Sequence, residues 1–151
     1  MVTADQLVGT WELVRWETSY EDGRKIYPMG EDAQGFILYT PDGFMSAVLF
    51  RANRPPFTTG EALTAKDTEK VAGWDGYYAY GGPFEIQGDR VVHTVAHCIY
   101  PNWVGDTQVR GISFEDDNLV LSTPPQKTRR GTQTSRVIWK RANRAYTGPR
   151  P

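Results

Sequence analysis

The sequence predicts an all-β protein, an antiparallel up-and-down barrel of about eight strands with one short helix inserted midway. Three observations support this fold class. Short runs rich in β-branched and aromatic residues recur along the chain. Turns of hairpin length, rich in Gly, Asp, Asn and Pro, separate these runs. The first run, residues 7–18, changes the phase of its apolar alternation, as a strand does at a bulge in a closing barrel.

The first strand carries the most information about the fold. Leu7, Trp11 and Leu13 share one parity, and Val14 and Trp16 share the other. A large buried indole at Trp11 would plug one end of a barrel, so this residue bears on the fold and not on chemistry.

The remaining elements follow in order. Residues 3–9 are expected to form a turn of helix, and 40–43 (Thr-Pro-Asp-Gly) a tight turn with Gly43 in the left-handed conformation. The predicted strands are 9–20, 34–40, 44–50, 80–87, 90–100, 107–114, 118–123 and 132–141. Both faces of several strands are apolar, so the pattern does not decide which face lines the interior.

A helix is predicted between the third and fourth strands, from Lys66 to about Tyr77. Thr64 and Asp67 have capping-box spacing, and Val71, Trp74 and Tyr78 form one stripe. Two roles stay open, a helix packed on the barrel wall and a lid over its mouth. One domain therefore spans 1–141, and residues 142–151 are expected to form a flexible tail.

Composition excludes several classes of function. Net charge is −1 with both signs interspersed, so no nucleic-acid partner is expected. No stretch is long and apolar enough for a membrane span, and no signal peptide is visible. Cys98 is the single cysteine, which leaves no internal disulfide and favours a cytoplasmic location. The oligomeric state is open, a homodimer included.

Several motifs resemble a known family. Gly9-x-Trp11 resembles the G-x-W signature of the lipocalins, and residues 9–14 are similar to the opening of the intracellular fatty-acid-binding proteins. Residues 27–43 and 101–105 resemble the small bacterial and fungal lipocalin-like domain family, and the likeness covers about residues 5–141. The resemblance implies a calycin-type lipocalin-like barrel in which Arg136 or Arg141 stacks on Trp11. Because such barrels include both carriers and enzymes, it does not select a function.

Metal and cofactor chemistry finds no support in the sequence. His93 and His97 lie on one predicted strand, where four residues span roughly 13 Å, too far for two ligands of one metal ion. Either histidine could serve as an axial haem ligand, but no other haem feature is present. No phosphate loop, dinucleotide fingerprint or nucleophile elbow occurs, so no cofactor is expected.

The leading hypothesis is a barrel that encloses a small, mostly hydrophobic ligand. His97 and Arg110 are its candidate polar or catalytic groups. The candidate wall residues are Tyr39, Phe44, Met45, Tyr80, Tyr100 and Trp103.

Two other functions stay open. The first is a cofactor-independent isomerase, cyclase or dehydratase acting on a hydrophobic natural-product intermediate. In it His97 would move the proton, aided by a tyrosine or Arg110. The second is a protein-interaction domain that uses exposed hairpin edges and the loop at residues 54–56 as its contact.

Overall fold

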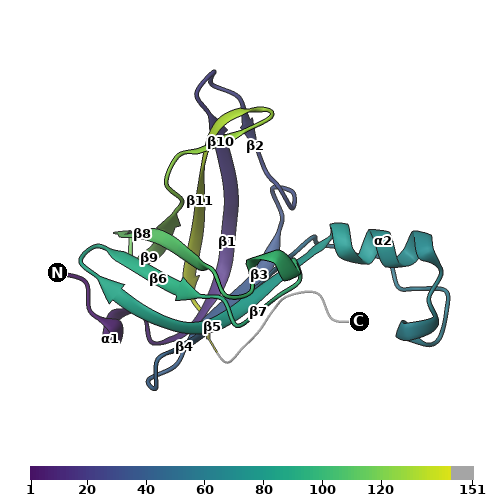
Figure 1. Cartoon of the computed structure of the whole chain (residues 1–151), viewed down its shortest axis with the longest axis horizontal. Helices are drawn as coiled ribbons and strands as arrows, with labels where there is room; N and C mark the ends of the chain where they lie inside the picture. The colour runs from purple at the N-terminus through teal and green to yellow at the C-terminus, as the bar shows by residue number, and fades with distance from the viewer. Residues whose placement is uncertain (144–151) are drawn as a thin grey trace.

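The computed structural model describes residues 1–143, and its eight long strands form a closed antiparallel barrel (Figure 1). Each strand of this ring pairs with its neighbour along the chain, and the last pairs with the first. The predicted up-and-down barrel is therefore confirmed. The strands are β1 (Gly9–Tyr20), β3 (Gln34–Tyr39), β4 (Phe44–Phe50), β5 (Tyr77–Gln87), β6 (Arg90–Thr94), β8 (Thr107–Glu115), β9 (Asn118–Ser122) and β11 (Gly131–Arg141).

Two short strands extend this ring. β2 (Lys25–Ile26) pairs with β1, and β10 (Gln126–Thr128) pairs with β11. The two resulting hairpins project together from the top of the barrel in Figure 1. The segment between the predicted strands 118–123 and 132–141 thus contains a short strand of its own.

The strand predicted over residues 90–100 is interrupted, which corrects the sequence interpretation. β6 ends at Thr94, and the chain then crosses to β5, where β7 (His97–Cys98) pairs with Gly81 and Tyr80. Gly82 permits the close approach, since a Cβ there would lie 2.0 Å from the carbonyl oxygen of Thr94.

The change of phase in the first strand is a β-bulge, as predicted. The register of β1 against β11 shifts between Leu13 and Arg15, and the extra residue Val14 is exposed. After the bulge Trp16 stands opposite Val137. The bulge therefore turns Trp16 toward the interior of the barrel, on the same side as Leu13 before it.

One end of the barrel is closed by α1 (Ala4–Leu7) and Trp11. The Trp11 indole donates a hydrogen bond of 2.8 Å to the carbonyl oxygen of Leu7. The Arg141 guanidinium carbon lies 3.9 Å from the centre of the Trp11 ring. Of the two arginines that the resemblance left open, Arg141 is therefore the one that stacks, while Arg136 pairs with Glu17 at 3.3 Å.

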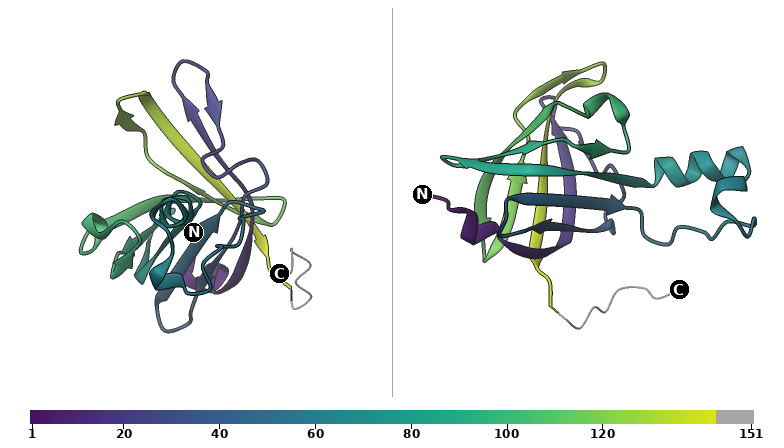
Figure 2. Two further views of the ribbon diagram at one scale, coloured as in Figure 1. Left: turned by 90° about the vertical axis from the view of Figure 1, so that its right-hand side faces the viewer. Right: turned by 60° about the horizontal axis from the view of Figure 1, so that its bottom comes forward.

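The helix α2 (Asp67–Asp75) occurs where it was predicted but extends as an arm beyond the barrel (Figure 2). None of its residues is buried, and Val71 and Trp74 are 59% and 50% exposed. Of the two roles that the sequence left open, packing on the barrel wall is therefore excluded, because the apolar side chains of α2 stay exposed beyond the barrel. In the described part of the chain no helix is long and apolar enough to cross a membrane. Most of the predicted tail, residues 144–151, lies outside the described residues.

Candidate functional site

A cavity of about 260 Å³ lies inside the barrel and is bounded by side chains from both halves of the chain. Its aromatic lining comes from β1, β5, β11 and the turn Pro101–Trp103. The aromatic members are Trp16, Tyr78, Tyr80, Trp103 and Trp139; the aliphatic members are Ile37, Ala47, Leu49, Leu121 and Val137; the polar members are Arg110, Thr123, Gln126, Gln133 and Ser135.

The aromatic wall is a connected cluster. The Tyr78 ring centre lies 6.1 Å from that of Trp16 and 5.8 Å from that of Trp103. The Tyr80 and Trp103 centres are 6.4 Å apart and nearly perpendicular. Such edge-to-face contacts stabilise each ring in its position and leave flat, polarisable faces for a guest molecule. Trp103 thus folds back from its short turn against the barrel core, where its apolar surface is partly removed from water.

A buried histidine forms hydrogen bonds to tyrosines at this wall. His93 is fully buried, and its Nε2 and Nδ1 atoms each lie 2.8 Å from a tyrosine hydroxyl, Tyr39 and Tyr80 respectively. Burial, with a smaller contribution from the positive charge of Arg110, lowers the pKa of His93 to about 3. The imidazole is therefore neutral at physiological pH, and both nitrogens are occupied in positioning tyrosines.

Three of the residues predicted from the sequence line the cavity together: Tyr80, Trp103 and Arg110. Tyr39 and Met45 are buried in the adjoining core, 2% and 3% exposed, without lining the cavity.

The other three predicted residues are not brought to the cavity. Phe44 is exposed because Met45, next to it on β4, has the inward parity. Tyr100 is also exposed. His97 is exposed as well. Its Nε2 atom lies 2.6 Å from the position that a Cβ atom on Gly81 would take. The His97 ring therefore lies on the outer face of β5, opposite the face from which Tyr80 points inward.

Sequence reasoning missed Trp16, Tyr78 and Trp139. Tyr78 was assigned to the helical stripe, but β5 begins at Tyr77, so Tyr78 and Tyr80 share the inward parity. The i, i+2 spacing from Tyr80, which was predicted, was the signal that could have found Tyr78. Trp16 could have been found only by placing the bulge correctly, because one residue of register decides which face it occupies.

The cavity carries positive charge and no carboxylate among its lining residues. Arg110 donates from Nη1 to the carbonyl oxygen of Val109 at 2.8 Å and from Nη2 to Oε1 of Gln108 at 3.1 Å. These two acceptors leave part of its five-donor capacity unused. Burial raises the pKa of Tyr78 well above its ordinary value, so its hydroxyl stays protonated. Within residues 1–143 no cluster of three or more His, Cys, Asp or Glu side chains could hold a metal ion.

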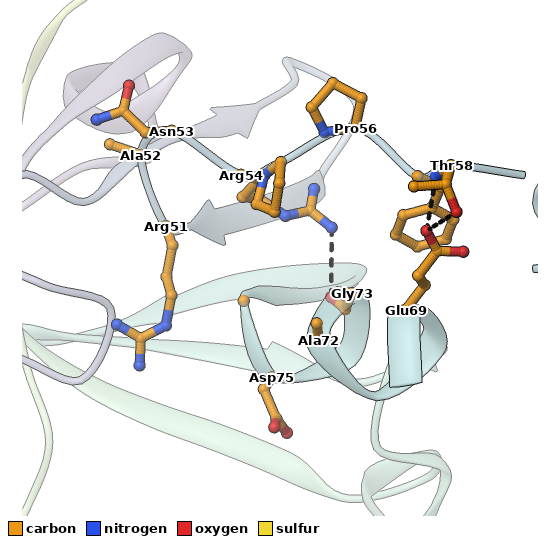
Figure 3. A pocket seen from close by; sticks show the side chains of 13 residues that line it. Arg51, Ala52, Asn53, Arg54, Pro56, Thr58, Glu69, Ala72, Gly73 and Asp75 are labelled. Atoms are coloured by element: carbon orange, nitrogen blue, oxygen red, sulfur yellow. Dashed lines mark hydrogen bonds between the residues drawn. The ribbon is translucent and has the colours of Figure 1, made fainter. Parts of the chain in front are cut away.

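A second hollow lies on the arm and not in the barrel (Figure 3). It measures about 680 Å³ and lies between α2 and the loop that runs from Arg51 to Thr58. Arg54 donates to the Gly73 carbonyl at 3.3 Å, and the Thr58 backbone N–H donates to Glu69 at 2.6 Å. These bonds fasten the loop to the helix. The barrel cavity is the better candidate site, because it combines an aromatic wall with a few convergent polar groups.

Comparisons with known proteins agree on the family. A family model described as a lipocalin-like domain matches residues 8–142. The 4'-hydroxy-3'-methoxypropiophenone carrier protein ppsC of Aspergillus oryzae is 33% identical over 109 residues, which cover 66% of this chain and 98% of that protein.

Solved structures with some likeness include a lipocalin-like protein from Bacteroides uniformis. It is 14% identical, with a TM-score of 0.48 over 91% of this chain and 99% of that one. The fluorescent protein UnaG is 12% identical, with a TM-score of 0.43 over 93% of this chain and 100% of that one.

Proposed function

Because this chain belongs to the lipocalin-like domain family, we propose that it binds a small, mostly hydrophobic molecule inside its barrel. One observation carries the proposal. The barrel interior is not filled by side chains but retains a cavity of about 260 Å³ with a wall of three tryptophans and two tyrosines. Filled interiors are the rule in small barrels, so retained space lined this way is typical of ligand binding.

The size of the cavity indicates the size of the guest. Pockets for drug-sized ligands usually measure about 300–1,000 Å³, and this cavity lies just below that range. A compound with one aromatic ring and short substituents fits such a volume, whereas a long-chain lipid does not. Aromatic side chains such as Trp103 and Tyr80 in the wall favour a guest that carries an aromatic ring.

The relative from Aspergillus oryzae suggests the chemical class. Its name describes a carrier of a single-ring aryl ketone. We infer that this chain also carries an aryl ketone of that size and does not transform it. The alternative of an acid–base enzyme finds no support in the geometry. His97 lies outside the cavity lining, and both nitrogens of His93 are occupied by tyrosines.

The test is a calorimetric titration with 4'-hydroxy-3'-methoxypropiophenone on the wild type and two matched variants. Ala47 lines the barrel cavity and Ala72 lines the hollow on the arm, so Ala47→Phe fills the first and Ala72→Phe the second. We expect saturable binding to the wild type, a loss of about tenfold or more in Ala47→Phe, and no change in Ala72→Phe.

Two results would contradict the proposal. Loss of binding in Ala72→Phe alone would move the ligand to the arm, and absence of binding to a folded wild type would reject this ligand class. Recovery of the ketone chemically unchanged after long incubation, checked by mass spectrometry, is expected of a carrier. Conversion to a product would favour the enzyme.

A further inference from the structure

Unpartnered polar atoms gather at the barrel cavity. Among the described residues, three buried side-chain nitrogen or oxygen atoms lack a hydrogen-bond partner: Nε1 of Trp16, the hydroxyl oxygen of Tyr78 and Nε1 of Trp139. All three side chains line the same cavity. A buried donor left without an acceptor costs about 1–3 kcal/mol, and native proteins keep few such groups. Their coincidence at one cavity points to a partner that the folded chain does not itself provide.

The strand register brings the two indoles together. Trp16 stands opposite Val137, and Trp139 stands opposite Leu13 on the same pair of strands. The two tryptophans are therefore diagonal neighbours on the inner face. The backbones of such neighbours are typically roughly 7–8 Å apart. Tyr78 approaches from the far side, with its ring centre 6.1 Å from that of Trp16.

All three groups have a hydrogen to donate. An indole N–H can only donate, whereas the Tyr78 hydroxyl can both donate and accept; it stays protonated because burial, together with the neighbouring Cys98 thiol, raises its pKa. Two hydroxyls of the cavity lining already have a partner. Ser135 Oγ bonds to Thr18 Oγ1 at 2.7 Å, and Thr123 Oγ1 accepts from the Ser135 backbone N–H at 2.9 Å. Gln126 and Gln133 also line the cavity, but neither accepts a hydrogen bond from Trp16 or Trp139. The two indole N–H groups thus remain without an acceptor.

We propose that the indole N–H groups of Trp16 and Trp139, with the Tyr78 hydroxyl, form a subsite that binds the carbonyl oxygen of the guest. A ketone oxygen has two lone pairs and no hydrogen to donate, so it can accept from two of these donors at once. The subsite deepens the proposed function and rests on it, since it requires a guest inside the barrel. The subsite would let the barrel prefer apolar molecules that carry one acceptor oxygen over those that carry none.

A matched pair of probes isolates that oxygen. Propiophenone and n-propylbenzene share one carbon skeleton and differ only in the carbonyl group. Their dissociation constants are measured by calorimetry on the wild type, Trp16→Phe, Trp139→Phe and Trp103→Phe. Trp103 lines the same cavity, but its N–H is not among the buried unpartnered atoms, so its substitution is the control.

The measured quantity is the ratio of the two dissociation constants on each protein. A substitution that merely loosens packing weakens the binding of both probes alike and leaves this ratio unchanged. We expect Trp16→Phe and Trp139→Phe each to weaken the preference for propiophenone by about 3–10-fold, the range for one neutral hydrogen bond. Trp103→Phe should leave the ratio unchanged. If Trp139→Phe does not fold, Trp16→Phe against Trp103→Phe carries the comparison.

The outcomes separate the subsite from the proposed function. If both probes bind in the cavity and the ratio is the same in all four proteins, the subsite is overturned while ligand binding stands. If the ratio falls equally in Trp103→Phe, the effect is one of shape and the subsite is likewise overturned. If neither probe nor the substituted ketone used above binds, the proposed function itself has failed.

Discussion

The hydroxyl of Tyr80 lies 2.8 Å from Nδ1 of His93, and this bond connects the wall of the cavity to the core behind it. Tyr39 occupies the other imidazole nitrogen. A neutral imidazole has one donor and one acceptor nitrogen, so one tyrosine donates to it and the other accepts from it. The charged form would lose the acceptor nitrogen and be buried without a counter-ion.

Acid should therefore destabilise the protein through His93. The pKa of His93 is about 3 in the folded state against 6.5 for a free histidine side chain, so the unfolded chain binds the extra proton between these values. The His93 contribution to stability is fully present above about pH 6.5 and declines as pH falls toward 3, by up to about 1.4 kcal/mol per pH unit.

The comparison that isolates this effect is His93→Gln, which keeps hydrogen-bonding capacity and cannot titrate. Urea unfolding of both proteins is followed between pH 7.5 and pH 4.5. The free energy of unfolding of the wild type should fall more steeply with acid than that of His93→Gln. Parallel curves would show that His93 does not carry a depressed pKa.

The stability of the closed end of the barrel should depend on the guanidinium group of Arg141. Its guanidinium stacks on Trp11 and donates to the carbonyl oxygens of Val8 and Gln6 at 2.6 and 2.8 Å. Lysine keeps the charge but cannot stack and donate in two directions at once. We expect Arg141→Lys to lower the free energy of unfolding by about 1–2 kcal/mol.

Arg129→Lys is the control for that measurement, because Arg129 is exposed in the turn between β10 and β11 and should change stability by less than about 0.5 kcal/mol. Chemical denaturation of the three proteins gives the comparison. Equal stability of Arg141→Lys and the wild type would show that the stacking arrangement contributes nothing beyond charge.

Strand β3 should not tolerate a side chain at Gly35. A Cβ there would lie 2.1 Å from the carbonyl oxygen of Val48 on β4. Because backbone cannot move aside cheaply, Gly35→Ala should cost about 3 kcal/mol. Gly60→Ala meets nothing within 4 Å and should leave stability unchanged or raise it by up to about 1 kcal/mol. Thermal unfolding followed by circular dichroism measures both, and similar melting temperatures would contradict the close approach.

The fold could be predicted from sequence because its signals are local. The bulge of β1 shows as a change of parity after Leu13, and the turn before Phe44 shows in Thr40-Pro41-Asp42-Gly43, where Gly43 has φ +93°. The break after Thr94 could not be foreseen. The break depends on a close contact between Thr94 and Gly82, which are far apart in the sequence. The residues on both sides of the break favour a strand, so no local signal marks it.

The site was predicted less completely, for a related reason. Whether a residue lines the cavity depends on parity, and the apolar strands leave parity open. Phe44 and Met45 are both apolar neighbours on β4, so pattern alone could not show that only Met45 points inward. Tyr80, Trp103 and Arg110 were predicted as site residues, whereas Trp139 became recognisable only from its place opposite Leu13.

The most direct test of the central claim is a crystal structure of the protein soaked with 4'-hydroxy-3'-methoxypropiophenone. We predict electron density for the ring inside the barrel, beside Trp103 and Tyr80, with an oxygen within hydrogen-bond distance of Nε1 of Trp16 or Trp139. Density confined to the hollow between α2 and the Arg51–Thr58 loop, or an interior filled by side chains, would contradict the claim.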